Sequence, residues 1–144
     1  MKVEEQVCSV AQSKQLSQLG VTATPSFYWK ECAIPTEDKP SIQLVLADQL
    51  EHKGSGRYFP AYSVAELGLL LPAEITHEDE DLYLQGNIGN RKGEFFHIWF
   101  QSSIDNAEWD LFPAIEQDTE ALARADALIW LLENSYINPS HLQL

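Results

Sequence analysis

Hydrophobic and polar residues alternate with a period of two in four stretches of the chain, residues 26–32, 42–47, 82–85 and 94–101. Such alternation is typical of β-strands, in which successive side chains point to opposite faces of a sheet. The last stretch, EFFHIWFQ, is the clearest, and apolar side chains occupy both sets of alternate positions in it. This pattern predicts a central strand or one that is covered on both faces. The first two stretches, joined by a proline-containing connection, are expected to form a hairpin.

Other stretches have apolar residues at the spacing of an α-helix. They are residues 9–19, residues 63–71, and a segment that starts near 118 or 119 and ends near 134. The first two begin with a capping box, in which a serine and a side chain three residues later each bond the other's backbone N–H. These pairs are Ser9 with Gln12 and Ser63 with Glu66. Gly20 is placed for a left-handed C-terminal cap, and Pro72 ends the second helix because it lacks an N–H.

The last helix carries its apolar residues at helical spacing, and Arg124 and Asp126 are expected to mark its solvent side. Its apolar residues are Leu122, Ala125, Leu128, Ile129 and Leu132. This stripe is expected to pack against one face of the strand at 94–101, the face formed by Phe96, Ile98 and Phe100.

Strands and helices do not alternate strictly along the chain, which favours an α+β fold over a parallel α/β fold. We predict a mostly antiparallel sheet of about four strands with three helices packed on it. Residues 1–144 are expected to form a single domain, with a mobile loop at 48–57 and a frayed tail at 138–144. The segment 102–113 is expected to be irregular, with Trp109, Leu111 and Phe112 held against the body.

The composition indicates a globular protein of the cytoplasm. No apolar run approaches the roughly 18 residues that a membrane span requires. Glu4 and Glu5 lie where a signal peptide would have an apolar core. The two cysteines, Cys8 and Cys32, are too few for a disulfide framework and are expected to be free thiols.

Charge is distributed very unevenly along the chain. The formal net charge is −13, and residues 74–144 hold fourteen acidic residues against three basic ones, Arg91, Lys92 and Arg124. A field of this sign repels nucleic acids and anionic membranes, so neither is an expected partner. It suits a basic protein partner, while the alternative is an acidic surface that only keeps the protein soluble. The acidic residues chosen as the candidate binding surface are Asp105, Glu108, Asp110, Glu116 and Asp118.

The motifs for catalysis, metals and cofactors do not match this sequence. The acidic stretch THEDEDL at 76–82 has neither the spacing of an EF-hand nor that of HExxH, so we expect no metal site there. The glycines at 54–56 and 86–93 lack the spacing of a P-loop or a dinucleotide fingerprint, and no cofactor is expected. His97 is expected to be a satisfied histidine within the sheet, and no catalytic residue is assigned.

Three stretches resemble a known group of proteins. They are AQSKQLSQLGV with FYW near the N-terminus, FPAYSVAELGLLLP in the middle, and TEALARADALIWLLENSYI near the C-terminus. Their order is similar to that in a family of small, acidic, uncharacterised proteins of bacteriophages, prophages and mobile elements of Bacteroides-type gut bacteria. The resemblance implies a phage-linked, intracellular setting and no reaction.

Together these observations favour a non-enzymatic accessory protein that binds another protein through its acidic C-terminal half. A specific form of this hypothesis is an inhibitor that mimics the charge of nucleic acid, or an immunity-type protein. Two alternatives stay open. One is a small hydrolase or nuclease that uses the carboxylates at 78–81, and the other is a structural component that oligomerises through an aromatic sheet face, in a state that the sequence does not determine.

Overall fold

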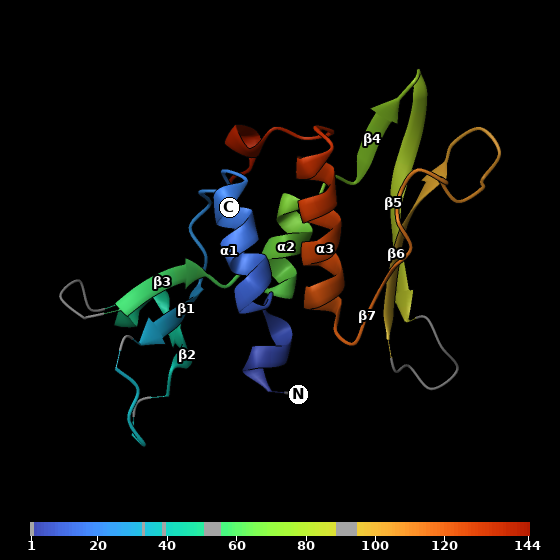
Figure 1. Cartoon of the computed structure of the whole chain (residues 1–144). Coiled ribbons are helices and arrows are strands. Elements are labelled where there is room, and N and C mark those ends of the chain that lie inside the picture. The colour runs from blue at the N-terminus through green and yellow to red at the C-terminus, as the bar shows by residue number, and fades with distance from the viewer. Residues whose placement is uncertain (1, 33, 39, 51–55, 89–94) are drawn as a thin grey trace.

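The computed structural model describes residues 2–32, 34–38, 40–50, 56–88 and 95–144. Over these residues the chain forms three α-helices and seven β-strands. The helices make a central layer, and the strands make two antiparallel sheets, one on each side of it (Figure 1). The helices are α1 (Val10–Gln18), α2 (Val64–Leu70) and α3 (Glu120–Glu133). The α+β class, the antiparallel pairing and the three helices are therefore confirmed, with the strands divided between two sheets.

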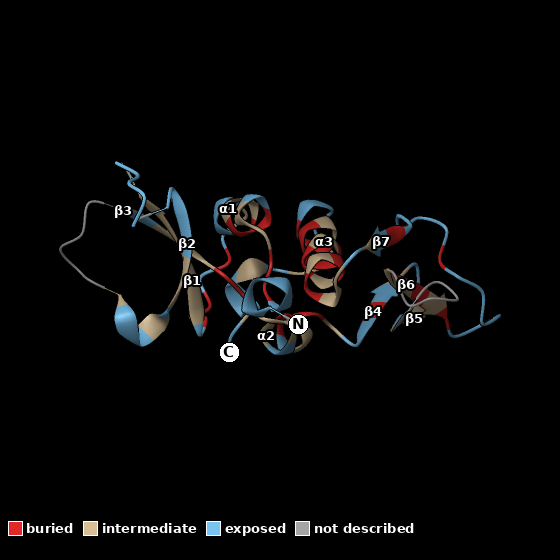
Figure 2. Ribbon diagram, turned by 90° about the horizontal axis from the view of Figure 1, so that it is seen from below, coloured by how far each residue is buried: buried red, intermediate tan, exposed pale blue. Residues whose placement is uncertain are grey.

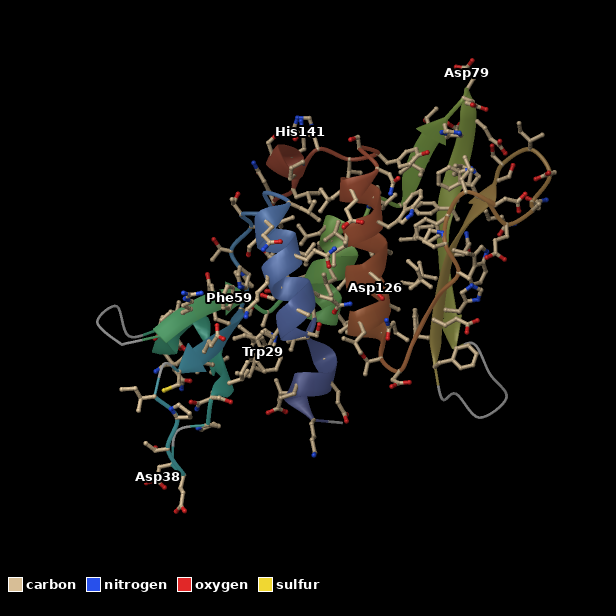
Figure 3. All side chains as sticks on the ribbon, in the orientation of Figure 1. Trp29, Asp38, Phe59, Asp79, Asp126 and His141 are labelled. Atoms are coloured by element: carbon tan, nitrogen blue, oxygen red, sulfur yellow. The ribbon has the colours of Figure 1, made fainter. Side chains whose placement is uncertain are left out.

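The first sheet has three strands in the order β2-β1-β3. They are β1 (Phe27–Cys32), β2 (Ile42–Leu46) and β3 (Gly56–Pro60). β1 and β2 pair antiparallel, which confirms the expected hairpin. α1 covers part of one face, where the Trp29 indole donates a hydrogen bond to the Cys8 carbonyl and Lys14 lies over the Phe59 ring (Figure 3). β3 falls in a region where the sequence predicted no strand, and part of the predicted loop, residues 51–55, lies outside the described residues.

The second sheet has four strands in the order β4-β5-β6-β7. They are β4 (Glu74–His77), β5 (Glu80–Ile88), β6 (Phe96–Ser102) and β7 (Ile115–Gln117). β6 lies inside the sheet, as its apolar sequence predicted, and all pairs are antiparallel. β4 and β7 were not predicted.

The acidic stretch at 76–82 is not a loop but the tip of the β4–β5 hairpin. His77 pairs with Glu80 across a two-residue turn, and Glu78 and Asp79 have positive φ angles of 50° and 62°. Such a turn usually carries Asn or Gly, because those residues tolerate positive φ. The sequence did not predict this hairpin turn, because Glu-Asp is an unusual sequence for it.

α3 lies at the centre of the molecule, between α1 and α2 on one side and the second sheet on the other (Figures 1 and 2). It packs against β6 and β7, as expected, and Leu128 is fully buried. Its alanines at alternate positions are also fully buried, namely Ala121, Ala123, Ala125 and Ala127. A helix that is apolar on several sides is one that neighbours enclose, and small side chains let those neighbours approach closely.

The expected solvent side of α3 was wrong. Asp126 accepts hydrogen bonds from the side-chain amides of Gln12 on α1 and Gln117 on β7, each at 2.6 Å (Figure 3). Arg124 bonds Glu120 one turn earlier and lies so close to Gly68 that a Cβ atom there would be 2.5 Å from its guanidinium. Both residues therefore join α3 to its neighbours.

The caps of α1 are those that the sequence predicted. Ser9 and Gln12 form the capping box, with Ser9 Oγ accepting from the Gln12 N–H at 3.2 Å and Gln12 Oε1 accepting from the Ser9 N–H at 3.0 Å. Gly20 has a φ of 91°, and the Val21 N–H returns to the Leu16 carbonyl, which closes a Schellman-type end.

The capping box of α2 is also confirmed, and it reaches further than the sequence indicated. The Glu66 carboxylate accepts from the Ser63 N–H at 2.8 Å, and its second oxygen accepts from the N–H and hydroxyl of Ser26 at 2.7 Å. Burial opposes ionisation of Glu66, but these hydrogen bonds outweigh it and lower the pKa. Glu66 therefore joins the start of α2 to the start of the first sheet.

We expect Ser63→Ala to lower the free energy of unfolding by about 1 kcal/mol, because the Glu66 N–H loses its cap. Aspartate is ordinarily as good a cap as serine, but here its carboxylate would lie beside Glu66 Oε2, which is 3.0 Å from Ser63 Oγ. Ser63→Asp should therefore destabilise at neutral pH and recover as acid protonates the pair. Urea unfolding at two pH values measures both effects, and full tolerance of Ser63→Asp at neutral pH would contradict the geometry.

The segment between β6 and β7 is held by aromatic packing. Trp109 and Phe112 are buried and belong to a cluster with Phe100, Trp130 and Tyr136. Leu111, which was expected to be held against the body with them, is 59% exposed, so that expectation was wrong. The buried rings fix a segment that otherwise has little regular structure.

The predicted frayed tail contains a short 3₁₀ helix, Pro139–His141, which is capped by the Asn138 side chain. Leu142 packs against the core. Within the described part of the chain, no helix has both the length and the apolar character needed to cross a lipid bilayer.

Candidate functional site

The second sheet has one face packed on α3 and one face that points away from the helices (Figures 1 and 2). Inward side chains such as Leu82, Ile98 and Phe100 are buried, and their sequence neighbours point to the other side. We call these outward side chains the outer face. They are Glu74, Thr76, Asp81, Tyr83, Gln85, His97, Trp99, Gln101 and Glu116.

The strand register arranges the outer face in a definite order. Tyr83 lies between Glu74 and Gln101, and Trp99 lies opposite Gln85. His97 lies opposite Glu116 on the edge strand β7. The aromatic rings therefore occupy the two inner strands, and carboxylates occupy the two edges. Tyr83 is 41% exposed, so the middle of this face is open to a partner.

His97 is not the satisfied histidine that the sequence predicted. Its ring packs on Trp99 with centroids 4.9 Å apart, and its Nε2 lies 3.7 Å from Glu108 Oε1. That distance is too long for a hydrogen bond, and Nε2 is buried without a hydrogen-bond partner among the described residues. No hydroxyl or thiol is bonded to this ring in the described part of the chain, so the arrangement does not form a nucleophile and base pair.

The five predicted acidic residues are all exposed, and they fall into two groups. Glu108 and Glu116 lie beside β6, because Glu108 pairs with Gln101 in an isolated bridge and Glu116 pairs with His97. The others lie in the connections on either side of β7, namely Asp105, Asp110 and Asp118. Asp105 accepts a hydrogen bond from the Ala107 N–H at 3.0 Å, which lowers its pKa. No hydrogen bond or ion pair joins these three residues to Glu108 or Glu116 over the described ranges.

Sequence reasoning missed the residues that make the rest of this face. Glu74, Asp81 and Trp99 were not among the predicted binding residues. The alternation of β6 indicated that Trp99 and His97 share one face of the strand. It did not indicate which face the helices cover, because that depends on the tertiary structure. Trp99 is only partly buried.

The outer face has no lysine or arginine side chain among the described residues. Of the three basic residues in the C-terminal half, Arg124 lies on α3 and is bonded to Glu120. Arg91 and Lys92 lie outside the described residues. The carboxylates at the edges of the face are therefore not neutralised by a neighbouring lysine or arginine within the part of the chain that the structure shows.

The carboxylates at 78–81 do not converge. Glu78 and Asp79 are exposed at the hairpin tip (Figure 3). Ser102 donates a hydrogen bond to Glu80, and Thr76 donates one to Asp81 at 3.2 Å. Over the described ranges, no group of three or more His, Cys, Asp or Glu side chains is placed to hold a metal ion. This geometry gives the hydrolase alternative no catalytic centre at 78–81.

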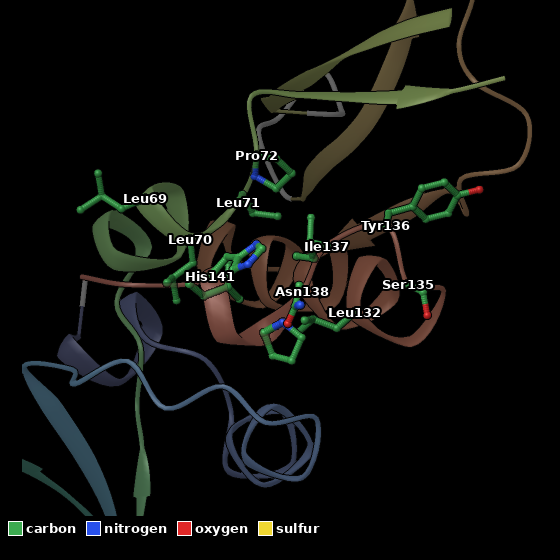
Figure 4. A pocket seen from close by; sticks show the side chains of 12 residues that line it. Leu69, Leu70, Leu71, Pro72, Leu132, Ser135, Tyr136, Ile137, Asn138 and His141 are labelled. Carbon is green, nitrogen blue, oxygen red and sulfur yellow. The ribbon is translucent and has the colours of Figure 1, made fainter. Parts of the chain in front are cut away.

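An open groove of about 800 Å³ lies between the end of α2 and the C-terminal segment (Figure 4). Its lining includes the apolar residues Leu69, Leu71, Ile137 and Leu142 and the polar residues Ser135, Asn138 and His141. The side-chain oxygen of Asn138 already accepts hydrogen bonds from Ser140. The groove therefore presents both apolar and polar side chains, and the Asn138 oxygen already has a partner.

The two cysteines are free thiols, as expected. Burial raises the pKa of Cys8 to about 12, so its thiol is inert at neutral pH. Burial also raises the pKa of Tyr62, whose hydroxyl donates to the Ala23 carbonyl at 2.6 Å. The Cys8 thiol donates to the Pro60 carbonyl at the end of β3, and Cys8 and Tyr62 are both fully buried in the core.

Comparison with known proteins gives no relative from which a role can be transferred. No protein-family model, curated protein or solved structure matches this chain.

Proposed function

We propose that this protein binds a basic partner protein through the outer face and the acidic connections beside it. The observation that carries the proposal is the composition of that face, in which half-exposed aromatic rings are bordered by carboxylates on both edges. Aromatic side chains supply much of the binding energy of protein interfaces, and complementary charge accelerates association. An accessory role in a phage-linked, cytoplasmic setting agrees with the resemblance in sequence and stays part of this proposal.

The partner is expected to be a protein and not a nucleic acid. Phosphate backbones bind where lysine and arginine cluster, and the outer face has carboxylates in those places. A basic protein surface is attracted to this face, because the carboxylates neutralise its positive charges. The oligomer alternative, which uses an aromatic sheet face, has weaker support, because the carboxylates that border the aromatic rings of the outer face would repel those of a second copy.

Two variants with equal net charge test the proposal. The face variant carries Glu108→Gln, Asp110→Asn, Glu116→Gln and Asp118→Asn. The control variant carries Glu4→Gln, Glu37→Gln, Asp38→Asn and Asp48→Asn, all exposed and located in the N-terminal half. Asp38 lies at the far end of the molecule from the second sheet (Figure 3).

We expect a lysine homopeptide to associate about tenfold more slowly with the face variant than with the control variant at low salt, because local charge governs the encounter rate. Stopped-flow fluorescence with labelled peptide measures this rate, and urea unfolding checks that both variants keep the stability of the parent. Raising the salt should remove the difference, since the Debye length falls to about 8 Å near physiological ionic strength. If association slowed equally in both variants, the rate would depend only on the total charge of the chain. That result would contradict the proposal.

A further inference from the structure

Trp99 lies between two carboxylates on the outer face. The register pairs Gln101 with Glu108 and His97 with Glu116, so Trp99 lies between these two pairs along β6. Glu108 Oε1 lies 3.7 Å from His97 Nε2, so its carboxylate extends along β6 from the level of Gln101 toward His97, on the β7 side of the strand. The indole thus has His97 packed on one side and acidic groups along its β7 edge.

Both of these carboxylates have acceptor capacity to spare. Neither Glu108 nor Glu116 accepts a hydrogen bond from any residue within the described ranges, and the His97 Nε2 contact with Glu108 is too long to be one. Each ionised carboxylate offers several lone-pair positions and binds a planar fork of N–H donors best. The unused acceptors therefore lie beside an aromatic ring that is partly buried.

We propose that the outer face anchors an arginine side chain of its partner, with the guanidinium stacked on the Trp99 indole and hydrogen-bonded by Glu108 or Glu116. Arginine can bind the aromatic ring and the carboxylate at the same time. Its planar guanidinium stacks on aromatic rings and donates two parallel N–H hydrogen bonds to a carboxylate. Lysine carries the same charge but is a compact, strongly hydrated ammonium that does neither as well. This inference rests on the proposed function and specifies the chemistry of the partner.

An arginine homopeptide and a lysine homopeptide of equal length and equal charge provide the test. Calorimetry with the unmodified protein should show the arginine peptide binding about tenfold more tightly. The ratio of the two affinities should fall to near one in Trp99→Leu. It should be retained in Trp99→Tyr, which keeps an aromatic ring. Glu108→Gln should lower the preference for the arginine peptide more than Glu37→Gln does. The Glu37 variant is the control, because it removes the same charge from the N-terminal half of the chain.

The outcomes separate this inference from the proposed function. Equal affinity for the two peptides, together with a loss of binding in the four-residue face variant, would overturn the arginine anchor and leave the acidic binding surface standing. Equal effects of the face and control variants would overturn both. The comparison of peptides on the unmodified protein decides the question even if Trp99→Leu fails to fold. An arginine preference that survives Trp99→Leu and is lost in Tyr28→Leu, on the other sheet, would also contradict the assignment.

Discussion

Trp109→Ala is expected to lower the free energy of unfolding by about 3–5 kcal/mol, the cost typical of removing a large buried aromatic side chain. Trp109 is 8% exposed and contacts rings from β4, β6, α3 and the C-terminal segment. It meets Trp130 and Tyr136 edge to face, at centroid distances of 5.8 and 5.3 Å, and Phe100 at 6.2 Å. Its removal leaves a cavity that the surrounding α3, β6 and C-terminal segment cannot fill without moving. Urea unfolding followed by circular dichroism measures the loss.

The neighbouring Leu111 is the matched control for this substitution. It lies in the same irregular segment but is 59% exposed, so Leu111→Ala should change stability by no more than about 0.5 kcal/mol. Because Glu108 directly precedes Trp109, the loss of this ring should also release Glu108 from its place beside β6. Similar, small effects of the two substitutions would mean that the segment is not anchored by the aromatic cluster.

Asp126→Ala is expected to cost about 2–4 kcal/mol, because one N–H of each of two part-buried side-chain amides loses its acceptor, while the Gln12 amide keeps its second hydrogen bond to the Leu122 carbonyl. The Gln12 and Gln117 amides each donate to the Asp126 carboxylate at 2.6 Å. Gln12 cannot rotate its amide to compensate, since its Oε1 already accepts from the Ser9 N–H in the capping box of α1. Chemical denaturation monitored by tryptophan fluorescence gives the value.

Two further substitutions define the role of Asp126. Asp126→Asn keeps the shape but replaces one acceptor oxygen with a donor, so it should cost less than the alanine change and still be measurable. Asp118→Asn, at an exposed position two residues before α3, should be nearly neutral. If Asp126→Ala were as mild as Asp118→Asn, the carboxylate would not be holding α1, α3 and β7 together.

Local signals in the sequence determined the helices and their ends. The capping boxes at Ser9 and Ser63 and the left-handed cap at Gly20 involve groups only a few residues apart, so their physics is complete within the segment. The strand at 42–47 and the one at 94–101 were also predictable, because each is long enough to show its alternation. The α+β class followed from the order of these elements.

Short strands and unusual turns were not predictable. β4 and β7 have only four and three residues, which is too short to show a periodic pattern, and β3 (GRYFP) has no alternation of apolar and polar positions. The existence of these strands depends on a partner strand that supplies the hydrogen bonds. The turn at Glu78 and Asp79 adopts positive φ angles that sequence rules assign to Asn and Gly. Here the pairing of the flanking strands outweighs the local preference of the turn residues.

For the candidate site, the sequence by itself determined the charge of the C-terminal half and named Glu108 and Glu116. Only the tertiary structure decided that these acids border an aromatic sheet face, that Trp99 and His97 lie on that face, and that Asp126 and Arg124 do not mark a solvent side. The physical reason is that periodicity reveals which residues share a face of a strand or helix. Which faces become covered depends on packing between segments far apart in the chain, and a local pattern does not contain that information.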